Sequence, residues 1–290
     1  MRTLVGLIGS MRPKQWIKNL LVFAAPAAAG VLDEPDQLAR TSVTFLAFGL
    51  VAGAMYIVND LIDRERDAHH PTKQNRPIPS GRVSVTAAVV AAMVALGLGG
   101  AMVLVWVNAA VLLLLMGYVA NTLVYSVVGK HEPVIDVVQV SIGFVLRAVG
   151  GALAVDVPIS EWFAIVVMFG ALLMVVGKRA SEVKALEGSA DSRPILDRYS
   201  PLFLHHLHAV STTGMLLAYS LWAFETAEQA TSAFPWFELS IVPIVVAILR
   251  YGYAIDAGSA QAPEDALFAD RVLLAAAAVW AGLFFGGMYG

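Results

Sequence analysis

The sequence predicts an all-α polytopic membrane protein, and two observations lead to that fold class. The chain has 290 residues, of which 58% are hydrophobic and 14% are charged, and its mean hydropathy is +0.72. Soluble domains are typically about 25% charged and about 45–50% apolar. The apolar residues also form runs of roughly 17–25 residues, which is the length that a helix needs to cross a bilayer. We expect all 290 residues to form a single membrane-embedded domain.

By this length criterion the chain contains about nine transmembrane helices. They cover roughly residues 16–31, 41–58, 84–106, 109–128, 134–155, 161–177, 204–224, 237–254 and 267–288. The first run is short enough to be tilted or partly interfacial. The N-terminal residues show no cleavage-site pattern after an apolar core, so we expect no removable signal peptide. Because the sequence has no cysteine, disulfides, thiolate metal sites and cysteine nucleophiles are excluded.

The positions of the basic residues predict the orientation in the membrane. Of the 19 lysines and arginines, only Arg40 falls in an expected outer loop, and Arg147 falls within a span. Lysine and arginine are enriched in cytoplasmic loops, so we expect a cytoplasmic N-terminus and, with an odd number of spans, an outer C-terminus. The long charged connections share the cytoplasmic side, and loops on a rigid scaffold commonly carry function. We therefore expect a multi-pass membrane protein whose site opens to the cytosol.

The stretch "VNDLIDRERDAHHPTKQNRPIPSG" places many charges directly after an apolar run. If the helix continues past the membrane edge, Asp60, Asp63 and Asp67 share one face at i, i+3 and i+7, with Asn59 beside Asp63. Carboxylates crowded together repel each other unless a cation neutralises them. Their hard oxygens suit Mg²⁺, which often takes its remaining ligands from substrate phosphates.

Two basic residues follow this acidic stripe in the same stretch. Lys73 and Arg76 lie in the "KQNRP" segment, where they are placed to bind phosphate oxygens directly. The alternative is a solvated cytoplasmic loop in which arginines and aspartates pair locally. The position of the carboxylates against a membrane helix favours the binding site.

A second polar stripe lies in the expected fifth span. Asp136, Gln139, Gly143 and Arg147 recur at i, i+3, i+7 and i+11 along an otherwise apolar helix. A charge inside a membrane helix by default marks a functional site and has a partner. Arg147 is 11 residues, or ~16 Å, from Asp136 along the helix. The alternative is a structural arginine–aspartate pair that joins two helices.

Three further groups of charges are less specific. "VVGKRASEVKALEG" places Lys178 and Arg179 one helical turn before Glu182, although inner-side basic residues are expected in any case. The "HHLH" at 205–208 is interpreted as interfacial rather than metal-binding, because no second ligand cluster accompanies it. The N-terminal "RPKQWIKN", which contains Arg12, Lys14 and Lys18, fits equally an anchor to anionic headgroups and a phosphate clamp.

The segments "NDLIDRERD" and "KQNRPIPSG" together resemble the first aspartate-rich signature of the UbiA superfamily of intramembrane prenyltransferases. This resemblance implies about nine helices around a central cavity, a cytosol-facing diphosphate site that depends on Mg²⁺, and a lateral opening for the lipid. Typical members carry a second "DxxxD" after the sixth helix, whereas this chain has "GKRASEVKALEG" there. With "RPKQWIKN" and "RPILDRYSP", the chain resembles the branch that transfers phosphoribosyl groups to decaprenyl phosphate.

The resemblance implies a pentosyl transfer from 5-phosphoribosyl 1-diphosphate to decaprenyl (polyprenyl) phosphate, with release of diphosphate, for the arabinan of a cell-wall arabinogalactan. It assigns Asn59, Asp60, Asp63 and Asp67 to the metal and diphosphate, with the three aspartates as catalytic metal ligands, and Lys73 and Arg76 to phosphate. Further substrate or phosphate contacts are inferred at Lys14, Lys18, Tyr125, Lys130, Arg147, Lys178, Arg179 and Glu182. Asp67 or Glu182 is a candidate to orient the ribose or support its positive charge, and Lys14, Lys18, Lys130 or Arg147 to hold the attacking phosphate.

Two other functions are weighed against this one. The first is prenyl transfer from a prenyl diphosphate to an aromatic or other acceptor, which keeps the first motif but favours a second aspartate cluster. The second is lipid transport, which favours broken helices in matching halves and several charges in the middle of the membrane. We expect lipid and small-molecule partners and no nucleic acid. The small-residue stretches "ALGLGGA" and "AVGGALA" offer surfaces for close helix packing and leave a homo-oligomer open.

Overall fold

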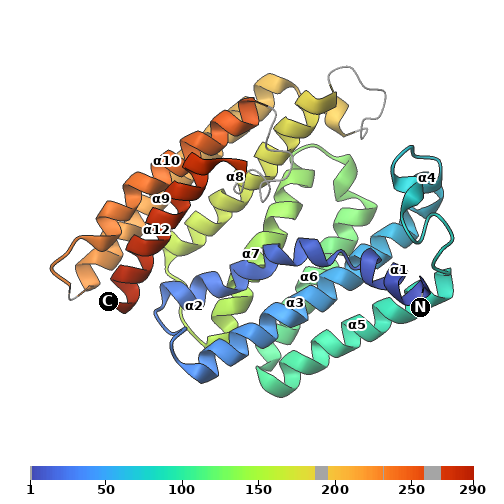
Figure 1. Cartoon of the computed structure of the whole chain (residues 1–290), viewed down its shortest axis with the longest axis horizontal. Helices are drawn as coiled ribbons and strands as arrows, with labels where there is room; N and C mark the ends of the chain where they lie inside the picture. Colours follow the sequence, from blue (N-terminus) through green and yellow to red (C-terminus); the bar gives the residue numbers. More distant parts are fainter. Residues whose placement is uncertain (1, 187–194, 231, 258–268) are drawn as a thin grey trace. The chain divides into compact units, whose positions relative to one another are not determined.

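The computed structural model describes residues 2–186, 195–230, 232–257 and 269–290. Every regular element in these ranges is a helix, and no strand occurs in them (Figure 1). The predicted all-α class is thereby confirmed. Seven of the described helices are long and apolar enough to cross a membrane.

The chain divides into two compact units. Unit 1 comprises Met1–Gly129 and Leu146–Pro158, and unit 2 comprises Lys130–Val145 and Ile159–Gly290. Helix α7 (Ile135–Val155) contributes its first half to unit 2 and its second half to unit 1. The expectation of one domain stays a prediction, and the two units are described separately below.

Unit 1 is built on two long helices, α3 and α5, which pack along each other (Figure 1). Polar caps determine where several of its helices begin. Ser84 accepts a hydrogen bond from the Ala87 N–H at the start of α5, and Asn108 accepts one from the Val111 N–H at the start of α6. In chain order the elements of unit 1 before α7 are α1 (Arg2–Ser10), η1 (Pro13–Phe23), α2 (Ala24–Ala28), α3 (Pro35–Ile62), α4 (Arg64–Ala68), η2 (Lys73–Asn75), α5 (Val85–Trp106) and α6 (Ala109–Val127).

Glycines allow the closest helix contacts inside unit 1. A Cβ at Gly151 of α7 would lie 1.8 Å from the Val22 carbonyl oxygen of η1, so the two backbones touch there. A Cβ at Gly99 of α5 would lie 2.9 Å from the Val51 side chain of α3. Both glycines belong to the small-residue stretches noted in the sequence, and both serve packing within the chain.

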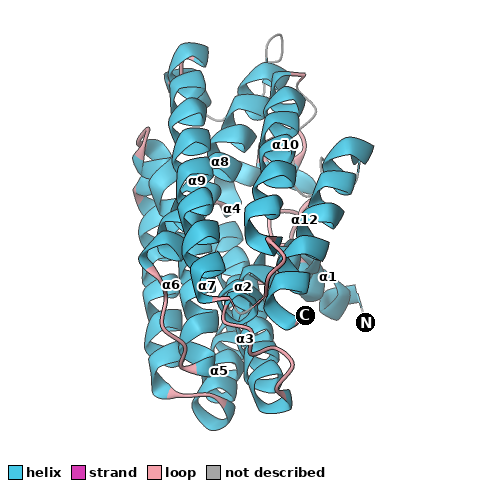
Figure 2. Ribbon diagram, turned by 90° about the vertical axis from the view of Figure 1, so that its left-hand side faces the viewer, coloured by secondary structure: helices cyan, strands magenta, loops and turns pink. Residues whose placement is uncertain are grey.

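Unit 2 contains a bundle in which α8 packs on α9, α9 on α10, and α10 on α12. Trp222 of α9 is central to it, because its ring lies 5.8 Å from the rings of both Phe237 and Phe284. Figure 2 shows these long helices joined by loops. The elements are η3 (Gly129–His131, whose first residue belongs to unit 1), α8 (Glu161–Leu186), η4 (Leu196–Arg198), α9 (Pro201–Gln229), α10 (Trp236–Asp256) and α12 (Arg271–Tyr289).

Most of the expected spans coincide with a helix to within a few residues. Two spans, 16–31 and 204–224, differ from the expected apolar transmembrane helix. The run 16–31 is not one α-helix, because η1 is a 3₁₀ helix, α2 has only five residues, and the chain turns at Gly30 with a φ of 69°. Helix α9 has 29 residues, but it is not among the seven apolar helices, since its residues include three histidines. The first two residues of the last expected span, 267 and 268, lie outside the described residues. The count of nine spans stays a prediction, as does the orientation of the termini.

The contact at Gly151 predicts that Gly151→Ala lowers the free energy of unfolding by at least about 2 kcal/mol, because the added methyl group meets a backbone oxygen that cannot rotate away. Thermal unfolding in detergent measures the effect. Gly97→Ala is the matched control, since nothing lies within 4 Å of its Cβ position and alanine favours the helix. Equal melting temperatures for the two variants would contradict the contact.

Candidate active site

The acidic motif lies where α3 ends and α4 begins. Helix α3 ends at Ile62, Asp63 is its cap residue with φ −88° and ψ 2°, and α4 starts at Arg64. The helix that the sequence analysis extended through Asp67 is therefore interrupted at a single residue. The Asp63 N–H still bonds to the Asn59 carbonyl and the Asp67 N–H to the Asp63 carbonyl, so Asp67 remains about one turn beyond the break.

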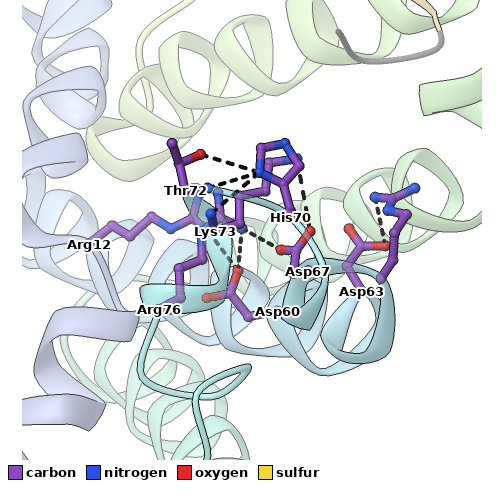
Figure 3. Close-up of polar contacts among 9 residues, drawn as sticks. Arg12, Asp60, Asp63, Asp67, His70, Thr72, Lys73 and Arg76 are labelled. Atoms are coloured by element: carbon purple, nitrogen blue, oxygen red, sulfur yellow. Dashed lines mark hydrogen bonds and ion pairs between the residues drawn. The ribbon is translucent and has the colours of Figure 1, made fainter. Parts of the chain in front are cut away.

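Arg76 joins the two most buried carboxylates of this motif. Asp60 and Asp67 are each only 1% exposed. Arg76 Nη1 lies 2.7 Å from Asp67 Oδ2 and 3.2 Å from Asp60 Oδ1, so that one guanidinium bridges both acids (Figure 3). Lys73 Nζ lies 3.8 Å from Asp67 Oδ1. Arg76 thus pairs with the aspartates, a contact that the alternative of local arginine–aspartate pairing predicts, although the acids are buried rather than solvated. Phosphate binding by Lys73 and Arg76 stays a prediction.

A second arginine reaches Asp60 from the N-terminal segment. Arg12 Nη2 donates to Asp60 Oδ1 at 2.6 Å, and its guanidinium carbon lies 4.7 Å from the centre of the Tyr56 ring. We call Arg12, Asp60, Asp67, Lys73 and Arg76 the unit 1 charge cluster. Each buried carboxylate in it faces at least one cation, which satisfies the requirement that a desolvated charge be paired.

Asp63 points away from this cluster. Its carboxylate pairs with Arg66 at 3.1 Å, and Figure 3 shows it apart from Asp60 and Asp67. Within the described ranges no group of three or more His, Asp or Glu side chains is placed to hold one metal ion. The expected convergence of three aspartates is thus seen for two of them, and a metal-binding role for Asp63 stays a prediction.

The two converging carboxylates fit a bound cation. Asp67 Oδ1 is buried and accepts no hydrogen bond, and its neighbour Lys73 is beyond hydrogen-bonding distance. Carboxylate oxygens are the ligands that Mg²⁺ prefers. Asp60 and Asp67 are therefore the residues that would hold such an ion, with the bridging guanidinium supplying positive charge at the same carboxylates.

Unit 2 holds another buried ionic group. Arg179 of α8 makes a two-pronged contact with Asp136 of α7, at 2.7 Å from Nε to Oδ2 and 2.9 Å from Nη2 to Oδ1. Its Nη1 donates to Glu182 Oε2 at 2.6 Å, and Lys178 Nζ lies 4.0 Å from Glu182 Oε1. We call these four residues the unit 2 charge cluster. The sequence analysis anticipated the contacts along α8 but not the partner of Asp136.

Neighbouring groups hold the loop before α7 in place. The Val134 N–H donates to the Tyr199 hydroxyl at 3.0 Å, and Arg198 donates to the His131 carbonyl oxygen at 2.7 Å. Burial raises the pKa of the Tyr199 hydroxyl above its ordinary value. These contacts fix the start of α7, where Asp136 lies.

Arg147 is buried within unit 1, with 6% of its surface exposed. Its Nε donates to Asn19 Oδ1 at 2.7 Å and its Nη2 donates to the Tyr118 hydroxyl at 3.0 Å. Its guanidinium carbon also lies 4.9 Å from the centre of the Tyr118 ring. The arginine–aspartate pair that joins two helices, considered as the alternative for this stripe, is formed by Asp136 of α7 with Arg179 of α8, whereas the contacts of Arg147 given above are to Asn19 and Tyr118.

The remaining predicted site residues lie outside these two clusters. Asn59 is half-buried in the last turn of α3, Lys14 is exposed on η1, and Lys18 is half-buried on η1. Tyr125 of α6 and Lys130 of η3 are half-buried, in unit 1 and unit 2 respectively. Substrate roles for these five residues stay predictions. Arg193 and Pro194 of the "RPILDRYSP" stretch lie outside the described residues.

The sequence analysis missed several partners that the structure supplies. Arg12 was considered only as a lipid anchor or a phosphate clamp, and its contact with Asp60 joins residues 48 apart in the chain. Asn19 and Tyr118, the partners of Arg147, were not singled out. One feature of the sequence could have indicated the role of Asn19, namely that this polar residue ends "RPKQWIKN" inside an expected apolar span.

The fold and the site define a helical membrane protein with a buried, cation-matched carboxylate pair at the end of α3. The sequence profile described as the UbiA prenyltransferase family matches residues 20–276. The chain therefore belongs to the UbiA prenyltransferase family.

Several relatives share most of the chain. A protein of Corynebacterium glutamicum named decaprenyl-phosphate phosphoribosyltransferase is 38% identical over 95% of this chain and 84% of its own length. Proteins with the same name from Mycobacterium tuberculosis and Mycolicibacterium smegmatis are 39% and 38% identical. They cover 95% and 98% of this chain, and 91% and 92% of their own lengths.

Solved structures share the fold. A UbiA homologue from Archaeoglobus fulgidus, bound to GPP and Mg²⁺, superposes with a TM-score of 0.73 at 17% identity and covers 98% of both chains. A structure of digeranylgeranylglyceryl phosphate synthase gives a TM-score of 0.69 at 16% identity and covers 99% of both chains. At these identities the likeness concerns the fold.

The buried pair in unit 2 predicts that Asp136→Asn lowers the free energy of unfolding by about 3 kcal/mol. The substitution removes one of the two carboxylates of the cluster that pair with the buried Arg179, and Glu182 is the one that remains. Glu132→Gln is the matched control, since the Arg198–Glu132 pair is more than half exposed and is expected to contribute less than about 1 kcal/mol. Chemical unfolding in detergent measures both. A smaller loss for Asp136→Asn than for the control would rule out the assigned role.

Proposed function

We propose that the chain transfers the 5-phosphoribosyl group of 5-phosphoribosyl 1-diphosphate to decaprenyl phosphate, or to a polyprenyl phosphate of another length, and releases diphosphate. The observation that carries this proposal is the 38–39% identity, over at least 95% of the chain, to relatives named decaprenyl-phosphate phosphoribosyltransferase. The proposed reaction takes place on the cytoplasmic side of the plasma membrane, which the inner-side excess of basic residues favours. Its product would serve cell-wall arabinan synthesis.

In this reaction a phosphate oxygen of the lipid forms a bond to the anomeric carbon of the ribose. The bond from that carbon to the diphosphate oxygen breaks, and diphosphate leaves with the electron pair. A phosphate monoester is already anionic at neutral pH, so the attack needs no general base. The site must stabilise negative charge on the leaving group and positive charge on the ribose ring. Attack from the face opposite the diphosphate inverts the anomeric centre.

The unit 1 charge cluster is suited to the leaving diphosphate. A Mg²⁺ ion on Asp60 and Asp67 would neutralise the diphosphate as a Lewis acid. Arg76 and Lys73 have side chains that are 30% and 21% exposed, so their N–H donors are partly accessible to solvent. They are therefore the residues proposed to bind phosphate oxygens. Arg12, whose side chain is also 30% exposed, forms its ion pair with Asp60 from the N-terminal segment.

The unit 2 charge cluster has a different chemical character. Arg179 is 4% exposed and directs three of its nitrogens at carboxylates, which makes it a group that positions Glu182 rather than a phosphate ligand. Lys178 is 39% exposed and lies at the limit of ion-pair distance from Glu182, so a substrate phosphate can compete for it. Glu182 is then the carboxylate proposed to orient the ribose hydroxyls.

The central test is the loss of activity when a buried carboxylate of unit 1 is neutralised. Asp60→Asn and Asp67→Asn are each expected to lower kcat/KM by at least about 100-fold, because the metal and the leaving group lose a charged ligand. Transfer of label from ribose-labelled 5-phosphoribosyl 1-diphosphate into the lipid fraction, with decaprenyl phosphate added, measures the effect. Asp36→Asn is the control, since Asp36 forms an exposed pair with Arg40 at the far end of α3. Full transfer by either cluster variant would remove the proposal for this site.

Metal binding has a readout that does not depend on turnover. Mg²⁺ with inorganic diphosphate is expected to raise the melting temperature of the wild-type protein, because a ligand that binds only the folded state stabilises it. The same addition should shift the Asp60→Asn and Asp67→Asn variants by less than half as much, while Asp36→Asn behaves as the wild type. An equal shift in all four proteins would mean that these carboxylates do not hold the ion.

The alternative is transfer of a prenyl group, which the family name and the GPP-bound homologue favour. A competition assay with purified protein separates the two functions. Labelled geranylgeranyl diphosphate and labelled phosphoribosyl diphosphate are supplied in turn, each with and without decaprenyl phosphate and each with and without an aromatic acceptor. We expect incorporation only from the phosphoribosyl donor and only when the lipid phosphate is present. Incorporation from the prenyl donor into an aromatic acceptor would favour the alternative.

A further inference from the structure

The N-terminal helix α1 has an outward apolar face without a partner in unit 1. Leu4, Val5 and Ile8 are 61%, 67% and 51% exposed. Ile8 is four residues from Leu4 and three from Val5, so the three side chains lie within an arc of about 100° around the helix. Three large apolar side chains exposed together on nine residues indicate a surface that meets something apolar.

The opposite face of α1 is firmly attached to unit 1. A Cβ at Gly6 would lie 2.8 Å from Val83 and 3.5 Å from Pro77, so the α1 backbone rests directly on the segment that precedes α5. Leu7 packs against the core cluster that includes Val83. Ser10 is 2% exposed and donates to the Gly6 carbonyl oxygen at 3.0 Å. The outward face is therefore held in a fixed direction.

Helix α1 rests beside the start of a helix that is long and apolar enough to span the membrane. Helix α5 is one of the seven candidate spans, and it begins two residues after Val83, on whose side chain α1 rests. The first turns of α5 expose Val85, Val89 and Val90 by 42%, 40% and 49%. Helix α1 itself is about 13 Å long, too short to cross a bilayer. A short apolar-faced helix beside the end of a span has the geometry of an interfacial helix.

We propose that α1 lies in the bilayer interface with Leu4, Val5 and Ile8 among the lipid chains, and that this seating positions Arg12 on Asp60. Arg12 follows α1 by two residues and has a left-handed backbone, with φ 51° and ψ 60°, which non-glycine residues seldom adopt. Such a conformation is kept only where the surroundings enforce it. Met11, between them, packs against Gly53 of α3, where a Cβ would lie 2.8 Å from its methyl group.

Arg12 is in this view a positioning residue whose own place depends on the lipid. Its guanidinium reaches Asp60 at 2.6 Å while its backbone forms the turn between α1 and η1. If α1 leaves the interface, the turn moves and the contact with Asp60 is lost. The seating of α1 is independent of the reaction, whereas its effect on catalysis rests on the proposed function.

The first experiment measures where α1 lies. Because the chain has no cysteine, single-cysteine variants can be labelled with an environment-sensitive fluorophore at one position each. Leu4→Cys, Val5→Cys and Ile8→Cys are reconstituted into lipid nanodiscs, with Glu65→Cys as the aqueous control, since the Glu65 side chain is 90% exposed. Quenching by spin-labelled acyl chains and by aqueous iodide is compared for each.

Interfacial seating predicts that the three α1 labels emit at shorter wavelength than the control and are quenched about threefold more by the acyl-chain label. Iodide should quench the control most strongly. If iodide quenches the three α1 labels as strongly as the control, the helix lies in water and the proposal is overturned, whatever the enzyme's activity.

The second experiment tests the link to Arg12 by a double-mutant cycle. The triple variant Leu4→Gln, Val5→Gln, Ile8→Gln is expected to raise the KM for 5-phosphoribosyl 1-diphosphate about fivefold in nanodiscs, and to have no such effect when Arg12→Ala is already present. Thr3→Gln, an exposed polar position on the same helix, is the matched control. A fivefold rise in both backgrounds would show that α1 does not act through Arg12. A protein that binds lipid through α1 but transfers no phosphoribosyl group would refute the proposed function and leave the seating intact.

Discussion

The bridge that Arg76 forms between Asp60 and Asp67 connects the end of α3, the short helix α4 and the segment that follows η2. Both carboxylates are almost wholly buried, and an unpaired buried carboxylate costs several kcal/mol. The loop therefore has to fold back over the end of α3 for unit 1 to be stable. This folding also brings Lys73 close to the acids, at 3.8 Å from Asp67. The same pairing places the carboxylates that would hold a metal ion next to the cations that are proposed to bind phosphate.

The buried carboxylate of Asp136 in unit 2 is also paired with a cation, but a ligand would displace this pair less easily. Asp136 receives two parallel bonds from one guanidinium, and both side chains are at most 4% exposed. In unit 1 the bonds are single, and the arginines are 30% exposed. A ligand can compete for a partly hydrated, singly bonded arginine far more readily than for a buried fork-shaped pair. The unit 1 charge cluster, with partly exposed and singly bonded arginines, is therefore suited to exchange with a substrate. The unit 2 charge cluster is suited to holding Glu182 in place.

The sequence predicted the fold class and the long helices, because long apolar runs leave few alternatives in a membrane protein. It assigned Lys73 and Arg76 to phosphate, and the local pairing that Arg76 forms with Asp60 and Asp67 was its alternative interpretation. Its failures have physical causes. Spacing placed Asp63 with Asp60 and Asp67, but the one-residue break at Asp63 turns its carboxylate to Arg66. Periodicity cannot assign partners across long separations, so the contacts of Arg12 with Asp60 and of Arg179 with Asp136 were not anticipated. The apolar run 16–31 concealed a 3₁₀ helix, because composition does not distinguish 3₁₀ from α geometry.

That 3₁₀ helix has a geometric reason that links the membrane interior to the site. An eleven-residue η1 is unusual, since 3₁₀ runs rarely exceed about four residues. Asn19 meets Arg147, and three residues later Val22 meets Gly151, four residues further along α7. Three residues of a 3₁₀ helix rise ~6 Å, and four residues of an α-helix rise the same distance, so the spacing of the two contacts matches the winding of η1. The bond from Arg147 fixes the Asn19 amide, and the backbone contact at Gly151 fixes Val22. With η1 held at these two points, its first turn is directed along α3, and Arg12 reaches Asp60.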